Sequence, residues 1–310
     1  MRSGPNADGP TPSQGDFHAR AGLVICIVSQ KGGVGKTTTS VNLSTAIALA
    51  EKTCLLVDSD PQGHATQAMA EIRHSGDCSL HRAMTGKAEL RDVVVPTHLE
   101  FLHLLPSSID LLQAEADLLR TRGKEGVMRS LLSGLRREYD YILIDTPPYL
   151  GLLTVNGLVA ADSLLIPLQC EFHAYTGLRQ LLRFISIVKE HLNPHIRDEG
   201  ILLSMLRPDQ PLHLRIADQA RASMPDRVLR TAIPWDSALP ESASQGKPIL
   251  LQNAGSPTSL LYLALARELM GRLSGSNDCT EGPEADESLP SFGNPHAPQE
   301  TSFAERNSLL

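Results

Sequence analysis

The sequence has few aromatic residues, no long apolar run and no paired cysteine motif. Aromatic side chains make up 4% of its 310 residues while 41% are hydrophobic, so the chain can bury a sizeable core and wholesale disorder is excluded. No segment approaches the ~20 consecutive apolar residues of a membrane-spanning helix. The five scattered cysteines lack C-x-x-C spacing, which favours a reducing cytosol over a disulfide framework or a zinc site.

The main part of the chain also lacks a strong charge of one sign. The formal net charge is −7, and −6 of it falls in residues 273–310, which leaves about −1 for residues 23–272. Nothing global therefore indicates nucleic acid as a partner, although a neutral body can still carry a local basic patch. Residues 1–22 are polar and rich in Pro and Gly, without the apolar region of a secretory signal. We expect 1–22 to be a flexible leader and 273–310 a disordered acidic tail.

Short apolar runs alternate with helical patterns over residues 23–272, which we expect to form one domain. Six strands are predicted at Leu23–Ser29, Thr53–Asp58, Tyr141–Asp145, Ser163–Leu168, Ile201–Met205 and Val228–Ile233. Helices are predicted at 36–50 and near 108–120, 124–138, 174–192, 213–223 and 257–272. Continuous apolar strands separated by helices predict an α/β fold, a mostly parallel twisted sheet with helices on both faces. Ligands of such sheets bind beyond the carboxyl ends of the strands.

A glycine-rich segment, SQKGGVGKTTT at 29–39, joins the first expected strand to the first expected helix. Gly32, Gly33 and Gly35 permit a tight turn whose backbone N–H groups face inward. The helix that begins at Lys36 adds the positive end of its dipole at the same point. The segment therefore predicts a phosphate-binding loop.

The side chains around this loop suit a nucleoside triphosphate with a metal ion. Lys36 supplies a cation for the β- and γ-phosphates, Thr37 a hydroxyl for Mg²⁺ and Thr38 a hydroxyl for a phosphate oxygen. Gln30 stands where the strict pattern G-x-x-x-x-G-K-[ST] has its first glycine. A second lysine, Lys31, stands before the glycines instead.

This loop, K-G-G-x-G-K-T-T, resembles that of the ParA/MinD family of deviant Walker-A ATPases. The segment DSDPQGHAT at 58–66 resembles the family's first switch, except that His64 replaces an Asn, which we interpret as tolerated variation. The family's Walker-B strand and second switch resemble YDYILIDTPP at 139–148. Two further segments follow in the family's order, IPLQCE at 166–171 and LPESASQGKPI at 239–249. The resemblance covers about 23–272 and favours the ParA branch.

The resemblance implies an ATPase that uses ATP and Mg²⁺. Asp145, at the end of an apolar strand, would hold Mg²⁺ together with Thr37 and Asp58, and Asp60 would orient the attacking water. Lys31 would reach across an ATP-bound homodimer to stabilise charge on the partner's phosphates. The loop residues implied in ATP binding are Lys31, Gly32, Gly33, Val34, Gly35, Lys36, Thr37 and Thr38.

The residues that bind DNA in the family are the ones that this sequence matches least. In the ParA branch, arginines in two segments bind DNA non-specifically, but here Asp209 occupies one such position and Trp235 and Ala238 occupy two others. The remaining cations form either a replacement patch or a solvated face. The candidates for such a patch are Arg179, Arg183, Arg207 and Arg215. We therefore predict weakened DNA binding.

Several functions share this ATPase signature and stay open. The first is a cytoplasmic, nucleoid-associated partition protein stimulated by a ParB-like or other protein, and the second is a positioning ATPase for a protein cargo contacted through Trp235. A MinD-like membrane switch ranks lower because anionic lipid would repel the acidic tail, so no membrane partner is expected. A small-molecule ligase is compatible with the loop but disfavoured by the segments at 58–66 and 239–249.

Overall fold

The computed structural model describes residues 21–69, 78–171, 174–197 and 199–274. The chain divides into two compact units, Met1–Leu269 and Met270–Leu310, and the sheet and the candidate site lie in the first. The expected leader and tail lie almost wholly outside the described residues, so their flexibility stays a prediction.

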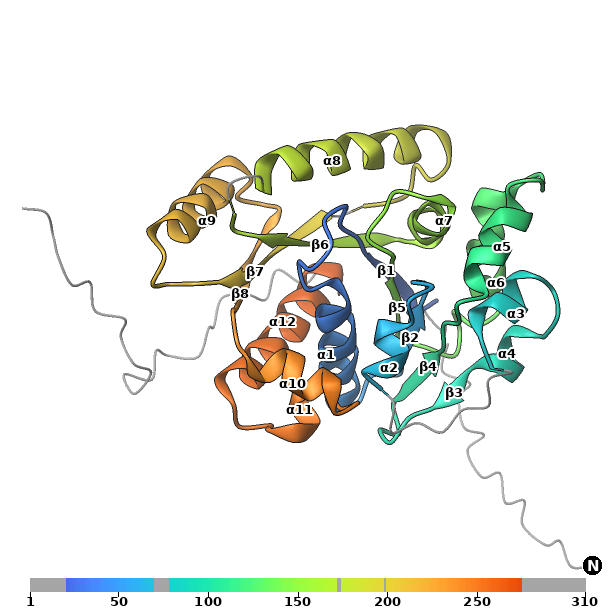
Figure 1. The fold of residues 1–310 in the computed structure, drawn as a ribbon, viewed down its shortest axis with the longest axis horizontal. Coiled ribbons are helices and arrows are strands. Elements are labelled where there is room, and N and C mark those ends of the chain that lie inside the picture. The colour runs from blue at the N-terminus through green and yellow to red at the C-terminus, as the bar shows by residue number, and fades with distance from the viewer. Residues whose placement is uncertain (1–20, 70–77, 172–173, 198, 275–310) are drawn as a thin grey trace, which may run out of the picture. The chain divides into compact units, whose positions relative to one another are not determined.

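The first unit is built on one eight-stranded sheet with the order β3-β4-β2-β5-β1-β6-β7-β8 (Figure 1). Its strands are β1 (Leu23–Ile27), β2 (Cys54–Asp58), β3 (Val95–Pro96), β4 (Leu102–Leu105), β5 (Tyr141–Asp145), β6 (Ser163–Gln169), β7 (Glu199–Leu206) and β8 (Val228–Pro234). All neighbouring pairs are parallel except β3 and β4. The six predicted strands are confirmed, with ends that differ by up to two residues.

The pair β3 and β4 was not predicted. β3 has only two residues and includes a proline, which cannot donate to the ladder and is confined to edge strands. β4 reads LHLL, and its histidine interrupts the apolar run that marks a buried strand. Both strands therefore fall below the length and pattern from which a strand can be recognised.

Helices cover both faces of the sheet, as the pattern of apolar strands predicts. They are α1 (Lys36–Leu49), α2 (His64–Gln67), α3 (Leu80–Met84), α4 (Leu90–Val93), α5 (Leu111–Leu118), a 3-10 turn η1 (Lys124–Gly126), α6 (Val127–Ser133), α7 (Leu152–Ala160), α8 (Ala174–His191), α9 (Pro211–Ser223), α10 (Ala238–Ser244), α11 (Ile249–Gln252) and α12 (Pro257–Ser274). Helices α7 and α8 lie on one side of the central strands and α1 on the other (Figure 1). The helix predicted at 124–138 is shorter and divided, with a 3-10 turn before α6 and an end before Gly134.

The core forms where apolar strand residues meet these helices. One cluster packs β2 and β5 residues such as Leu55 and Ile142 against α3, α5 and α6, and another packs Cys26 and Ile201 against α7, α8 and α9. Central strands such as β2 and β6 are buried on both faces, which explains why their sequences are continuously apolar rather than alternating. Within the described ranges, no helix is both long enough and apolar enough to span a bilayer.

Strand register brings the functional segments to one edge of the sheet. Asp145 at the end of β5 lies opposite Ile27 at the end of β1 and opposite Asp58 at the end of β2. The loops that leave these three strands therefore start side by side. Pro147 and Pro148 come two and three positions after Asp145, and the next helix, α7, begins only at Leu152.

Candidate functional site

The loop between β1 and α1 has the backbone conformation that a phosphate cradle requires. Gly33 and Gly35 have φ values of 74° and 89°, in the left-handed region that side chains disfavour. Gly35 is the N-cap of α1, with no side-chain cap, so the first N–H groups of the helix are open to a ligand. This is the geometry in which a loop and a helix N-terminus bind an anion together.

The side chain of Lys36 folds back against the phosphate loop. The residue is only 6% exposed, and its Nζ donates to the carbonyl of Lys31 at 3.3 Å. Burial lowers the pKa of Lys36, while the nearby carboxylates of Asp145 and Asp60 raise it. The ammonium group is therefore placed to gain a strong partner when a phosphate enters.

Asp145 is fully buried and both its carboxylate oxygens accept hydrogen bonds from α1. Thr37 Oγ1 donates to Oδ2 at 2.8 Å, and Ser40 Oγ donates to Oδ1 at 2.8 Å. Burial raises the pKa of Asp145, whereas these two hydrogen bonds lower it. The contact joins two of the three residues that were predicted to hold Mg²⁺, and Ser40 is a member of the cluster that the sequence did not reveal.

A hydroxyl beside a buried carboxylate is a donor set that suits Mg²⁺. This ion keeps several waters and takes one or two protein oxygens together with substrate phosphates. Thr37 and Asp145 lie next to the phosphate loop, so these two residues would hold such an ion close to bound phosphates.

Asp58 is directed into the segment that follows it. Its Oδ2 accepts hydrogen bonds from both the N–H and the hydroxyl of Thr66, each at 2.7 Å, and its Oδ1 accepts from the N–H of Asp60 at 3.2 Å. Burial and the neighbouring Asp145 raise the pKa of Asp58. In this structure the carboxylate fixes the 58–66 loop, and its role as a metal ligand stays a prediction.

Asp60 lies at the start of the same loop and lines the pocket. The residue is 5% exposed, and its Oδ1 accepts from the N–H of Gln62 at 2.9 Å. The Ser107 hydroxyl donates to the Asp60 carbonyl from the strand end next to β2. Ser107 thus positions Asp60 from a distant part of the sequence, which no local motif could indicate.

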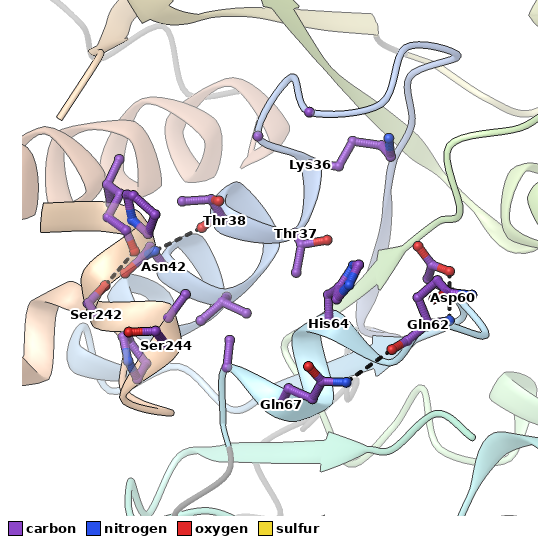
Figure 2. Close-up of a pocket in the computed structure, with 18 of the residues that line it drawn as sticks. Lys36, Thr37, Thr38, Asn42, Asp60, Gln62, His64, Gln67, Ser242 and Ser244 are labelled. Atoms are coloured by element: carbon purple, nitrogen blue, oxygen red, sulfur yellow. Dashed lines mark hydrogen bonds between the residues drawn. The ribbon is translucent and has the colours of Figure 1, made fainter. Parts of the chain in front are cut away.

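The loop, the 58–66 segment and the 239–249 segment enclose one pocket of about 550 Å³. Figure 2 shows Lys36 and Asp60 toward one end, Ser242 and Ser244 toward the other, and Thr37 and His64 between them. A pocket of this size lies within the range of small-molecule and cofactor sites. His64 was interpreted as tolerated variation, and the structure places it, exposed, on the pocket wall.

The 239–249 segment is connected to the phosphate loop through hydrogen bonds of Asn42 on α1. Its side-chain amide donates to the carbonyl of Thr38, and its carbonyl accepts from the N–H of Ile249, both at 2.9 Å. Asn42 and Ile249 are 207 positions apart. One side chain therefore holds the 239–249 segment against the phosphate loop.

The side chain of Lys31 is directed to the end of β6. Its Nζ contacts Glu171 and Gln169, and half of the side chain, 50%, is exposed. The predicted loop lysine thus makes its contacts with the 166–171 segment, while the pocket lining begins at Gly32.

The four arginines proposed for DNA do not have equivalent environments. Arg179 and Arg183 are exposed on α8 and Arg215 is exposed on α9. Arg207 follows β7 and stacks over the indole of Trp235, 4.5 Å from its ring centroid. Asp236, in the altered second segment, accepts hydrogen bonds from Ala238 and Thr258 and so fixes the start of α10.

Comparison with known proteins gives consistent matches over most of the chain. A family described as an AAA domain matches residues 22–197. The chromosome partitioning protein ParA of Myxococcus xanthus is 43% identical, covering 82% of this chain and 90% of its own. The sporulation initiation inhibitor protein Soj of Bacillus subtilis is 41% identical, covering 80% of this chain and 98% of its own.

Solved structures share the fold. Cobyrinic acid a,c-diamide synthase from Mycobacterium smegmatis, with bound ATP analogue and magnesium, superposes with a TM-score of 0.70 at 32% identity, over 82% of this chain and 96% of its own. The septum site-determining protein MinD from Pyrococcus horikoshii, with Mg-ADP, gives a TM-score of 0.69 at 24% identity, over 82% and 97%. The second likeness shows the fold alone.

Proposed function

This chain belongs to the ParA/Soj family of partition ATPases, and from that membership and the site geometry we propose that it is an ATP-dependent dimerising switch in chromosome or plasmid partitioning. ATP binding favours a homodimer, hydrolysis returns ADP-bound monomers, and a ParB-like or other protein stimulates the slow step. The observation that carries the proposal is the joining of Thr37 and Ser40 to the buried Asp145 beside the phosphate loop.

Binding of the triphosphate follows from the loop geometry. The N–H groups after Gly33 and at the start of α1 donate hydrogen bonds to phosphate oxygens. The Lys36 ammonium group leaves the Lys31 carbonyl and pairs with the terminal phosphates. Thr37 and Asp145 would hold Mg²⁺, which would supply positive charge to neutralise the phosphates. The apolar side chains of Met205, Leu239 and Pro240 line the same pocket and offer contact area to the rest of the nucleotide.

Hydrolysis needs a water in line with the terminal phosphate. Asp60 lines the pocket and is held by Gln62 and Ser107, so its carboxylate is preorganised to orient such a water. Phosphoryl transfer depends on positioning and charge neutralisation more than on a strong base, so a carboxylate is sufficient. Lys31, which contacts the end of β6 in this chain, is the cation we assign to the partner's phosphates.

The DNA-binding step is weakened in our proposal, although the protein would still act in the cytoplasm on the nucleoid. A second function, positioning of a protein cargo, is favoured by one observation: Trp235 is 52% exposed where the ParA branch has an arginine. An indole with an apolar body and one N–H donor is typical of protein interfaces.

One experiment tests the switch directly. Sedimentation velocity of the full chain with Mg-ATP and with Mg-ADP, in the wild type and in Asp60→Ala, measures whether ATP makes a dimer. We expect a dimer that accumulates in Asp60→Ala with ATP and a monomer with ADP. A single mass in all four samples would contradict the proposal.

A further inference from the structure

Helix α7 begins without a capping side chain of its own, and Glu115 on α5 takes that place. The N-cap residue of α7 is Gly151, which makes no side-chain cap. Glu115 Oε1 instead accepts from the N–H groups of Leu152 and Leu153, at 2.8 and 3.3 Å. The first N–H groups of a helix have no acceptor within the helix, and a carboxylate satisfies them at the positive end of the helix dipole. Helix α5 therefore fixes the point at which the chain enters α7.

The same carboxylate holds Tyr149 in the 146–151 segment, which connects β5 to α7. The Tyr149 hydroxyl donates to Glu115 Oε2 at 3.1 Å, and the Tyr149 carbonyl accepts from the Thr154 hydroxyl at 2.6 Å. The packing leaves no room for a side chain at Gly151, where a Cβ would lie 2.5 Å from the Tyr149 ring and 2.7 Å from Glu115 Oε1. The end of the 146–151 segment is thus held from two helices.

The 146–151 segment forms part of the nucleotide pocket. Pro148 lines the pocket, and a Cβ on Gly32 of the phosphate loop would lie 4.0 Å from the Pro148 Cβ, at van der Waals distance. The segment leaves β5 directly after the buried Asp145. A displacement of this segment therefore changes the wall that faces the phosphate loop.

The residues before Glu115 reach the other loop that borders the same pocket. The Ser107 hydroxyl donates to the carbonyl of Asp60 at 2.5 Å, and the Ser107 N–H donates to Thr66 Oγ1 at 2.9 Å. The 107–115 segment therefore contacts both the loop that carries Asp60 and the segment that carries Pro148. One short stretch of chain sets the relative position of the two.

We infer that Glu115 is a positioning residue for ATP hydrolysis, which holds the 146–151 segment against the phosphate loop through Tyr149 and the start of α7. The inference rests on the proposed hydrolysis of ATP in this pocket. Without the Glu115 carboxylate the segment loses its anchor, while the phosphate loop and Lys36 still bind the nucleotide. Because small displacements of positioning groups cost large factors in rate, we expect Glu115→Ala to slow hydrolysis by about 10- to 100-fold.

The test separates hydrolysis from nucleotide binding and from stability in the full-length chain. Single-turnover hydrolysis with protein in excess over Mg-ATP, isothermal titration of ADP and thermal melting are measured for each variant. Glu115→Gln is the conservative variant, because its side-chain oxygen can still accept from the Leu152 N–H. Tyr149→Phe removes the phenol contact and keeps the helix cap, so it tests the same anchor where Glu115→Ala does not fold.

Two control variants match the other consequences of the change. Asn193→Ala loosens the opposite end of α7, because Asn193 donates to the carbonyls of Leu158 and Ala161 at 3.0 and 2.8 Å. Asp117→Ala removes an equal charge from an exposed position on α5. Both controls should hydrolyse ATP at close to the wild-type rate, even though Asn193→Ala lowers the melting temperature.

The expected pattern is a loss of rate with retained binding. Glu115→Ala should hydrolyse slowly with ADP affinity near the wild-type value, and Glu115→Gln should recover most of the rate. Tyr149→Phe should slow hydrolysis by a smaller factor than Glu115→Ala. The double variant should be no slower than Glu115→Ala alone, because both changes remove the same contact.

Several results would overturn the inference. A wild-type rate in Glu115→Ala, or in Tyr149→Phe where Glu115→Ala does not fold, would make Glu115 a helix cap without effect on the pocket. An equal loss of rate in Asn193→Ala at an equal fall in melting temperature would make the effect one of stability. A fall in ADP affinity that matches the fall in rate would assign Glu115 to nucleotide binding instead. If the wild type does not hydrolyse ATP, the proposed function fails and this inference fails with it, and the wild-type sample identifies that case.

Discussion

Thr37 and Asp145 lie 108 positions apart in the chain, and their side chains meet at 2.8 Å between Oγ1 and Oδ2. Thr37 lies in the first turn of α1 and Asp145 ends the central strand β5, so the contact joins the start of the helix that follows the phosphate loop to the end of β5. Because Asp145 is also bonded to Ser40, a single buried carboxylate fixes two positions on α1. The site is thus coupled to the helix that carries the phosphate loop.

Replacement of Ser40 tests this coupling. Ser40→Ala removes one donor from a fully buried carboxylate, so we expect a loss of about 1–3 kcal/mol in the free energy of unfolding and weaker Mg-ATP binding. Ser44→Ala is the matched control, because Ser44 is a buried serine on the same helix whose hydroxyl donates only to the Val41 carbonyl. Urea unfolding and nucleotide titration check both variants, and equal effects at the two serines would contradict the role of Ser40.

Lys36→Ala should remove tight nucleotide binding without unfolding the protein. The loss of a charge-assisted contact to the terminal phosphates is expected to weaken ATP binding by about 10- to 100-fold. The fold should survive because burial disfavours the Lys36 ammonium in the free protein, as the direction of its pKa shift indicates. Isothermal titration and thermal melting measure the two effects, with the exposed Lys52→Ala as control. Unchanged ATP affinity in Lys36→Ala would contradict the assignment of residues 29–39 as the phosphate-binding loop.

Asp60→Ala should trap the ATP-bound form, whereas Asp58→Ala should loosen the fold. The Asp60 carboxylate lines the pocket, and its removal is expected to slow hydrolysis on the order of 100-fold with ATP binding retained. Asp58 instead accepts both hydrogen bonds of Thr66, so its removal leaves buried donors without their acceptor and lowers the melting temperature. Single-turnover hydrolysis and melting curves separate the two, and wild-type hydrolysis by Asp60→Ala would assign the water to another group.

The sequence was sufficient for the parts of this site whose chemistry is local. Gly35, Lys36 and Asp145 could be predicted because a loop, a helix start and a strand end each carry a recognisable pattern. Ser40 and Asn42 could not, because they follow the motif as ordinary polar residues and acquire partners only when β5 and the 239–249 segment fold against α1. The same holds for α10, a helix of seven residues that lines the pocket. It is shorter than the window in which helical periodicity can be read.

DNA binding should be weak at physiological salt compared with what the family suggests. Arg207, two positions before Asp209, is stacked on Trp235 at 4.5 Å, and an arginine in a cation–π contact gives up that partner when it turns to a phosphate. Arg179, Arg183 and Arg215 are exposed and free of such stacking in the structure, so we expect the remaining binding to depend on them.

A salt series measures this dependence. Each phosphate contact contributes about 0.9 to the slope of log affinity against log salt, so three missing contacts cost on the order of 10-fold or more in affinity. Retardation of non-specific duplex DNA by ATP-bound Asp60→Ala should therefore show a shallow slope, reduced further by Arg179→Ala with Arg183→Ala. Arg120→Ala with Arg122→Ala, at exposed positions just after α5, removes the same two charges and is the control for net charge. A steep slope with sub-micromolar affinity would contradict the prediction, because the altered segments would then have been compensated. Weak binding at every salt concentration would favour a protein cargo. In that case we expect Trp235→Ala to lose binding of the protein cargo.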